Sequence, residues 1–247
     1  MDNEPNVSFI EAALRANREL SELLHIKGLD VSHHQSFEVG AGGDRSAGID
    51  LEAEQIFIKH LLPFGEIISE ESGVIENPSS SVRIVLDPID GSDNLLSHLP
   101  YYGTSIAYFE NEICTKAMIT NLANGDVFIK DENGLRQGKI GKNEFSLVTN
   151  NSFSKVGIFE RSYCSYVAHE KLQSAHIKYR SPGAFALSLA YAHDVSFVLY
   201  EGAMRSYDVE AGLFMCEDLH SFYEGNIFLV SKDKEIFDKI KSLFISN

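Results

Sequence analysis

Apolar residues recur at the spacing of an α-helix in several stretches of the chain. The first stretch follows Ser8 and Glu11, a capping-box pair, and continues to Leu24, with Gly28 placed to end the helix. It is about five turns long, which is typical of a helix that covers a sheet. The same spacing predicts helices over residues 9–24, 51–62, 154–171, 184–192, 207–215 and 233–244.

Short apolar and β-branched runs bounded by turn residues lie between these helices and predict strands. The predicted strands cover residues 66–69, 83–87, 104–109, 113–119, 127–130, 145–149, 177–179, 195–200 and 227–230. Glu110-Asn111 and Asn124-Gly125 supply hairpin turns. Residues 31–48 show neither period and are rich in glycine, so we expect a mobile loop there. It is not a P-loop, because no Gly-Lys-Ser/Thr follows the glycines.

The mixture of hairpin-joined and helix-joined strands predicts a layered α/β or α+β protein. We find no repeat with a period of 20 to 50 residues and no low-complexity linker. A stretch rich in Gly and Lys near residues 137–145 marks a soft boundary. We therefore expect an N-terminal half over residues 1–140 and a C-terminal half over residues 141–247 that completes the site.

Composition narrows the class of protein. The chain has 247 residues, of which 44% are hydrophobic, so it can bury a sizeable core. Its net charge of −15 argues against a nucleic-acid partner but not against an anionic substrate, because cations can bridge two acids. The widely spaced Cys114, Cys164 and Cys216 are typical of reduced thiols. No apolar stretch approaches the length of a membrane span, so we expect a cytoplasmic protein with no membrane partner.

Candidate chemistry lies in carboxylates at the ends of predicted elements, which are Asp50, Glu70, Asp87, Asp90, Glu201 and Asp208. Hard divalent cations such as Mg²⁺ prefer oxygen ligands. Gly91 and Ser92 follow the second predicted strand, where backbone N–H groups can receive a phosphate. We find no zinc ligand set and no Gly-x-Ser-x-Gly elbow. A glycosidase carboxylate pair stays open, and Asp50 and Ser92 can also be read as helix caps.

Four motifs in register carry a family resemblance. Asp87–Ser92 resembles the Asp-Pro-(Ile/Leu)-Asp-Gly-(Thr/Ser) signature of the inositol monophosphatase superfamily, which includes fructose-1,6-bisphosphatases and 3′-phosphoadenosine 5′-phosphate phosphatases. Ser69–Ser72 resembles the family's Gly-Glu-Glu-Ser, and Tyr207–Gly212 resembles Trp-Asp-x-Ala-(Ala/Gly)-Gly. Gly48–Asp50, followed by a helix, is similar to the family's Thr-Asp segment. Glu201 precedes Asp208 by seven residues, as a substrate-contacting Glu does in inositol monophosphatases.

The resemblance implies an αβαβα five-layer sandwich, a homodimer, and the inhibition by lithium that many members show. It implies two or three Mg²⁺ ions per site, held by Glu70, Asp87, Asp90, Asp208 and the main-chain oxygen of Ile89. Catalysis is assigned to Glu70, which orients a metal-activated water, with Ser92 and Asp50 as a second polarising pair. The implied substrate contacts are Asp90, Gly91, Ser92, Gly183, Ala184, Glu201 and Asp208.

Departures from the family pattern leave the substrate open. Ala184 stands where many inositol phosphatases have Thr, and Glu210 stands where a small residue is usual. The resemblance implies a Mg²⁺-dependent phosphomonoesterase acting on a small phosphorylated metabolite, first of all inositol monophosphate. The alternatives are 3′-phosphoadenosine 5′-phosphate or fructose 1,6-bisphosphate, whose extra anionic group Arg180 and Arg205 could bind. A further alternative is a non-catalytic homologue that acts as a binding partner, which the retained carboxylates argue against.

Overall fold

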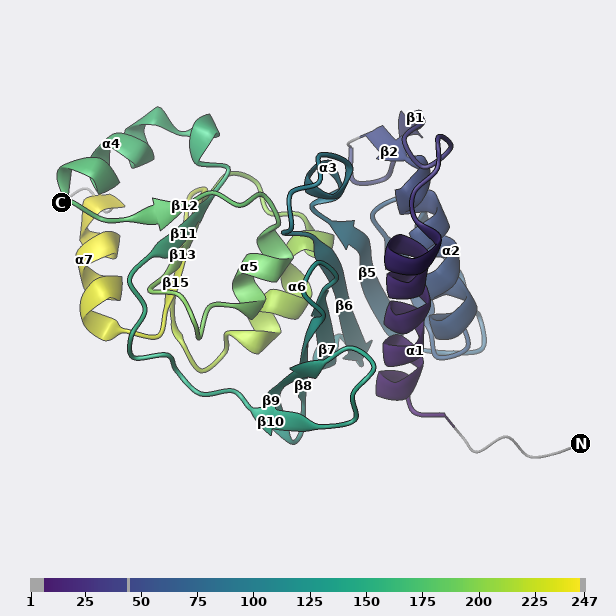
Figure 1. Cartoon of the computed structure of the whole chain (residues 1–247). Coiled ribbons are helices and arrows are strands. Elements are labelled where there is room, and N and C mark those ends of the chain that lie inside the picture. The colour runs from purple at the N-terminus through teal and green to yellow at the C-terminus, as the bar shows by residue number, and fades with distance from the viewer. Residues whose placement is uncertain (1–6, 44, 245–247) are drawn as a thin grey trace, which may run out of the picture.

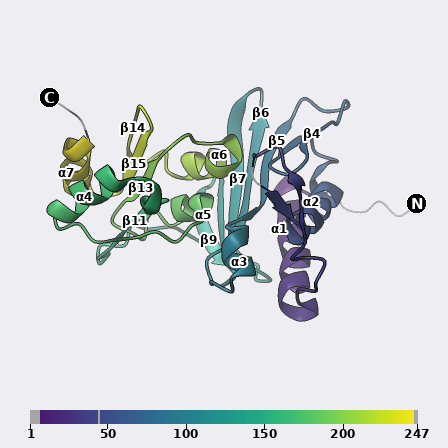
Figure 2. The ribbon, with the colours of Figure 1, turned by 90° about the horizontal axis from the view of Figure 1, so that it is seen from above.

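Helices and sheets alternate in five layers in the computed structural model, which describes residues 7–43 and 45–244 (Figure 1). The order is two helices, an eight-stranded sheet, two helices, a five-stranded sheet and two helices, and the view from above shows the same sequence of layers (Figure 2). The predicted αβαβα sandwich is confirmed. Apolar clusters fill each of the four interfaces between layers, as expected when every sheet is buried on both faces.

The first layer contains α1 (Phe9–Glu22) and α2 (Gly48–Leu61). The Ser8 hydroxyl accepts a hydrogen bond from the Glu11 amide at 3.2 Å, which confirms the Ser8 half of the predicted capping box, while the Glu11 carboxylate accepts from Arg15 at 2.7 Å. A π-helical turn (Leu23–Lys27) extends α1 until Gly28, which has a φ of 78°. The small residues Ala12, Ala13 and Ala16 of α1 are buried in the apolar cluster between this layer and the eight-stranded sheet.

The eight-stranded sheet has the order β10-β9-β8-β7-β6-β5-β3-β4. Its strands are β3 (Glu66–Ser69), β4 (Gly73–Ile75), β5 (Arg83–Asp90), β6 (Gly103–Glu110), β7 (Ile113–Asn121), β8 (Asp126–Asp131), β9 (Gly134–Lys139) and β10 (Phe145–Leu147). All its pairs are antiparallel except β3 with β5. Strand β5 runs three residues further than predicted, because its pairing with β6 resumes at Asp90 after an irregularity that follows Asp87.

The second sheet has the order β12-β11-β13-β15-β14. Its strands are β11 (Gly157–Glu160), β12 (Tyr179–Arg180), β13 (Val198–Glu201), β14 (His220–Glu224) and β15 (Ile227–Ser231). Helices α5 (Phe185–Ala190) and α6 (Ser206–Met215) lie between the two sheets, and α4 (Tyr166–Ser174) and α7 (Lys234–Phe244) cover the outer face (Figure 1).

One predicted α-helix is wrong over two thirds of its length. Residues 154–171 contain β11, a 3₁₀ turn (Ser162–Cys164) and only the beginning of α4. Parallel pairing with β12 and β13 buries all four residues of β11, so tertiary contacts override the mixed local pattern. Gly157 is required there, because a Cβ atom would lie 2.1 Å from the Phe197 ring.

The glycine-rich segment is more ordered than we expected. β1 (Ser36–Val39) and β2 (Arg45–Ala47) pair as an antiparallel ribbon, so the predicted loop over residues 31–48 is corrected to a short hairpin-like unit. The amides of Ala41 and Gly42 donate to the carbonyls of Glu71 and Glu70 at 3.0 and 2.7 Å. These bonds hold the segment against the end of β3.

The division into residues 1–140 and 141–247 stays a prediction. β10 belongs to the first sheet and lies beyond residue 140, and α5 and α6 pack against both sheets. Among residues 7–43 and 45–244, no helix is both long enough and apolar enough to cross a membrane.

Candidate active site

A cavity of about 470 Å³ opens where the two sheets and their shared helical layer meet. The ends of β3, β5 and β11 reach it, and so do α3 (Ser92–Leu96) and the first turn of α6. Predicted site residues that line it are Asp50, Glu70, Asp87, Ile89, Asp90, Gly91, Ser92, Gly183 and Asp208. The fold therefore brings most of the predicted site together from segments that are far apart in the chain.

Glu70, Asp87 and Asp208 form the centre of the site. One carboxylate oxygen from each lies within 4.8 Å of the other two. The parallel pairing of β3 with β5 places Glu70 beside Asp87, since these residues directly follow the paired residues Ser69 and Leu86. The Ser105 hydroxyl on β6 donates to the Tyr207 carbonyl at 3.3 Å and ties the start of α6, with Asp208, to that sheet.

Burial makes the carboxylates of Asp87 and Asp90 costly to ionise together. Asp87 is only 2% exposed, and its Oδ1 has no hydrogen-bond partner among the described residues. Its pKa is raised well above the usual range, first by burial and then by the charges of Glu70 and Asp90. The pKa of Asp90 is also raised by burial, although the Leu187 amide donates to its Oδ2 at 2.7 Å. An oxygen-only cluster with an unpartnered buried oxygen fits a hard divalent cation such as Mg²⁺.

Asp50 and Ser92 line the same cavity, but only Asp50 makes a hydrogen bond at the start of its helix. Asp50 is not the residue before α2 but its third residue, where its Oδ2 accepts from the Ala47 amide at 2.8 Å. Its Oδ1 has no partner among the described residues, and burial raises its pKa to about 7. Ser92 begins α3 and makes no capping hydrogen bond, since the cap position is Gly91 with a φ of 86°. Gly91 is needed there for that backbone conformation.

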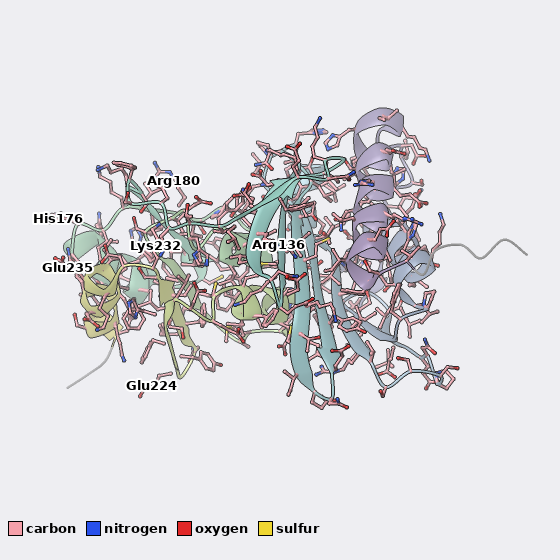
Figure 3. All side chains as sticks on the ribbon, turned by 90° about the horizontal axis from the view of Figure 1, so that it is seen from below. Arg136, His176, Arg180, Glu224, Lys232 and Glu235 are labelled. Atoms are coloured by element: carbon pink, nitrogen blue, oxygen red, sulfur yellow. The ribbon has the colours of Figure 1, made fainter. Side chains whose placement is uncertain are left out.

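Arg205 supplies the positive charge of the cluster. Its Nε and Nη2 donate to the two carboxylate oxygens of Asp208 at 2.9 and 3.2 Å. Its Nη1 lies 3.0 Å from Glu70 Oε1 and donates to the Gly42 carbonyl at 2.9 Å. Arg180, the other predicted anion-binding residue, does not line the cavity. It is exposed among the elements of the five-stranded sheet (Figure 3), and its guanidinium bonds to the Tyr179 carbonyl.

Glu160 is a cavity residue that the sequence did not reveal. It is 1% exposed at the end of β11, and burial raises its pKa. Its carboxylate accepts from the Gly183 amide at 2.9 Å, the Ala184 amide at 3.4 Å and the Ser188 hydroxyl at 2.5 Å. The predicted helix over residues 154–171 hid it. The available signal was Ile158-Phe159, an apolar pair directly before a carboxylate.

The predicted substrate contacts Gly183, Ala184 and Glu201 lie differently with respect to the cavity. Gly183 lines the cavity, while the Ala184 amide points to Glu160. Glu201 is not among the lining residues, and its carboxylate accepts from the hydroxyl of Ser165, the cap of α4. Arg45, Arg161 and Tyr163 line the cavity without having been predicted.

Comparison with solved structures defines the class of fold. The structure of an inositol monophosphatase–fructose 1,6-bisphosphatase is similar at a TM-score of 0.74 and 22% identity, over 96% of this chain and all of that chain (100%). SuhB of Bartonella henselae is similar at a TM-score of 0.73 and 20% identity, over 97% and 98% of the two chains. At these identities the likeness shows a shared fold.

Sequence comparison gives the family. The model of the inositol monophosphatase family matches residues 6–219, and the chain belongs to this family. Fructose-1,6-bisphosphatase of Pyrococcus furiosus is 29% identical over 158 residues, which are 62% of this chain but only 58% of that protein. Nus factor SuhB of Escherichia coli K12 is 26% identical over 215 residues, or 82% of this chain and 79% of that protein.

Proposed function

We propose that this chain is a Mg²⁺-dependent phosphomonoesterase that hydrolyses a small phosphorylated polyol, with inositol monophosphate the first candidate. The observation that carries the proposal is the Asp87 carboxylate, buried between Glu70 and Asp208 with no partner for Oδ1 among the described residues. Such a group is costly unless a cation completes it. Family membership supports the same chemistry.

The residues that would hold two or three Mg²⁺ ions are Glu70, Asp87, Asp90, Asp208 and Ile89 through its main-chain oxygen. When bound, Mg²⁺ supplies Lewis-acid stabilisation of phosphate charge and lowers the pKa of an attacking water. Glu70 would accept a hydrogen bond from the attacking water and orient it. Ser92 and Asp50, which line the same cavity, form a second polarising pair.

We assign the two parts of the substrate, its phosphate and its alcohol, to opposite sides of the cavity. The backbone at Gly91 and Ser92 receives the phosphate group. Asp90 and Asp208 orient the substrate hydroxyl next to that phosphate. The alcohol lies toward Gly183, Ala184 and Glu201, on the side of the five-stranded sheet. Glu201 can contribute from the rim if the alcohol shares its carboxylate with Ser165.

A second candidate is a substrate with another anionic group, such as a sugar bisphosphate or 3′-phosphoadenosine 5′-phosphate. Arg45 and Arg161 favour it, because both line the cavity and can bind the extra group in place of Arg180. The similarity to Nus factor SuhB keeps a non-catalytic binding role as an alternative. Family membership also leads us to propose a cytoplasmic homodimer that lithium inhibits.

Phosphate release from inositol phosphates, sugar bisphosphates and 3′-phosphoadenosine 5′-phosphate, with Mg²⁺ and with EDTA, tests the proposal. We expect turnover of at least one substrate with Mg²⁺ and none with EDTA. Asp90→Asn is the matched control, since it keeps an acceptor for the Leu187 amide but removes the charge, and we expect it to be inactive and folded. Activity that persists in EDTA would exclude the metal mechanism, and turnover of no substrate would favour the non-catalytic role.

A further inference from the structure

Arg205 occupies an unusual place for a cationic side chain in a site that would bind cations. It directly precedes α6, and its guanidinium donates a hydrogen bond to each carboxylate oxygen of Asp208, which lies three residues later in the chain. The same group reaches Glu70 Oε1 at 3.0 Å and the Gly42 carbonyl at 2.9 Å. One side chain thus joins α6, the end of β3 and the glycine-rich segment.

Arg205 contacts two of the three carboxylates that a metal ion in the cluster would need, those of Glu70 and Asp208. Any cation shared by Glu70, Asp87 and Asp208 must take an oxygen of Asp208, and both of those oxygens already accept hydrogen bonds from Arg205. A carboxylate oxygen can accept from two donors, but sharing would place a divalent ion next to a guanidinium. A divalent ion and a guanidinium bound to the same carboxylate repel each other strongly, because the site is partly buried.

We propose that Arg205 is a resident cation of the carboxylate cluster, which competes with Mg²⁺ for Glu70 and Asp208 and must move away from them as the site fills with metal. The inference rests on the proposed function, because it assumes that the cluster binds metal. It makes Arg205 a residue that sets metal affinity and occupancy. A phosphate carried into the cavity offers the displaced guanidinium a new anionic partner, which couples substrate binding to metal loading.

The opposite role for Arg205 is a positioning clasp that holds Asp208 ready for metal. The two roles predict opposite changes in affinity when the guanidinium is removed. A competitor, once removed, leaves a cluster that binds metal more tightly. A clasp, once removed, leaves a looser Asp208 that binds metal more weakly.

Binding of Mn²⁺, used alone as a paramagnetic probe in place of Mg²⁺, separates the two roles without an activity assay. The full chain and its Arg205→Gln variant are titrated while free Mn²⁺ is followed by electron paramagnetic resonance. Because the variant has no charge-assisted hydrogen bonds for the metal to displace, we expect its dissociation constant to be lower by roughly tenfold to a hundredfold. An unchanged or higher dissociation constant would overturn the inference.

Arg161→Gln is the matched control for charge alone. Arg161 lines the same cavity, but its guanidinium bonds to the Tyr200 hydroxyl at 3.3 Å and the Cys164 sulfur at 3.9 Å. We expect its dissociation constant for Mn²⁺ to change by less than about threefold. A gain as large as that of Arg205→Gln would show that net cavity charge, and not direct bonding to the carboxylates, sets the affinity.

Thermal unfolding gives a second readout. In EDTA, Arg205→Gln should unfold at a lower temperature than the wild type, because its carboxylates lose their counter-charge, and Mn²⁺ should raise its unfolding temperature by more. If the glutamine variant does not fold, Arg205→Lys takes its place in the titration. Lysine keeps the charge but not the forked guanidinium, so we expect a smaller gain in affinity. Unchanged affinity in the lysine variant also contradicts the inference. Failure of the wild type to bind Mn²⁺ would instead refute the proposed function itself.

Discussion

Asp87 and Glu160 are the most deeply buried carboxylates of the cavity, at 2% and 1% exposure, yet their surroundings differ. Glu160, on the side of the five-stranded sheet, accepts hydrogen bonds from two amides and a hydroxyl. Asp87, on the side of the eight-stranded sheet, has an oxygen with no partner among the described residues and faces other carboxylates.

The comparison assigns different roles to the two carboxylates: Glu160 is a structural group, and Asp87 is a proposed metal ligand. The donors around Glu160 hold the turn at Gly183 against β11, so this carboxylate is already satisfied by the fold. The buried like charges around Asp87 oppose folding, and under the proposed function a bound cation would offset this cost. Substitutions at the two positions should therefore move different observables.

The largest effect is expected for Asp87→Asn. Loss of the central carboxylate should lower the rate of phosphate release by about a thousandfold, since metal stabilisation of a transition state contributes several kcal/mol. The unfolding temperature in EDTA should stay equal or rise, because a buried charge among like charges is removed. Initial rates and circular dichroism melts check both results. A rate within about tenfold of the wild type would mean that Asp87 is not part of the reaction.

Asp50 extends the comparison to pH. Its pKa of about 7 in the folded chain lies above its ordinary value of 3.8, so the folded state holds this proton more tightly than the unfolded state. The stability that the proton contributes is fully present below about pH 4 and is lost as the pH rises through about 7. In EDTA, Asp50→Asn should remove on the order of 3 kcal/mol from the fall in stability over this window. Urea unfolding at several pH values measures it, and identical pH profiles would contradict the assignment.

Glu160→Ala should reverse the pattern expected at Asp87. Its buried donors lose their acceptor, so we expect a loss of about 2 kcal/mol in the free energy of unfolding. The dissociation constant for Mn²⁺ should change little, because Glu160 belongs to the other side of the cavity. Urea unfolding and Mn²⁺ titration of the same sample test both expectations. A large loss of Mn²⁺ affinity with normal stability would place Glu160 among the metal ligands.

How much the sequence predicts follows the same division. Glu70, Asp87 and Asp208 could be placed because each lies at the end of a predicted strand or in the first turn of a predicted helix, and such ends meet at one edge of a sheet. Glu160 could not, because β11 is a four-residue strand whose conformation is set by its neighbours β12 and β13. The bonds of Arg205 to Glu70 and Gly42 join residues far apart in the chain, and no local pattern encodes them.

The smallest effect is expected at Glu201, which resembles Glu160 in having a partner and Asp87 in having a proposed ligand. Its carboxylate accepts from the Ser165 hydroxyl, and it is not among the residues that line the cavity, although its neighbour Tyr200 is. If it also binds the alcohol, Glu201→Gln should lose about 1 kcal/mol of substrate-binding free energy. This loss would raise KM about fivefold and leave kcat unchanged. Ser165→Ala is the control: it removes the competing partner and should not raise KM. Steady-state kinetics that give the wild-type KM for Glu201→Gln would remove Glu201 from the substrate site, and Gly183 and Ala184 would remain as the proposed contacts of the alcohol.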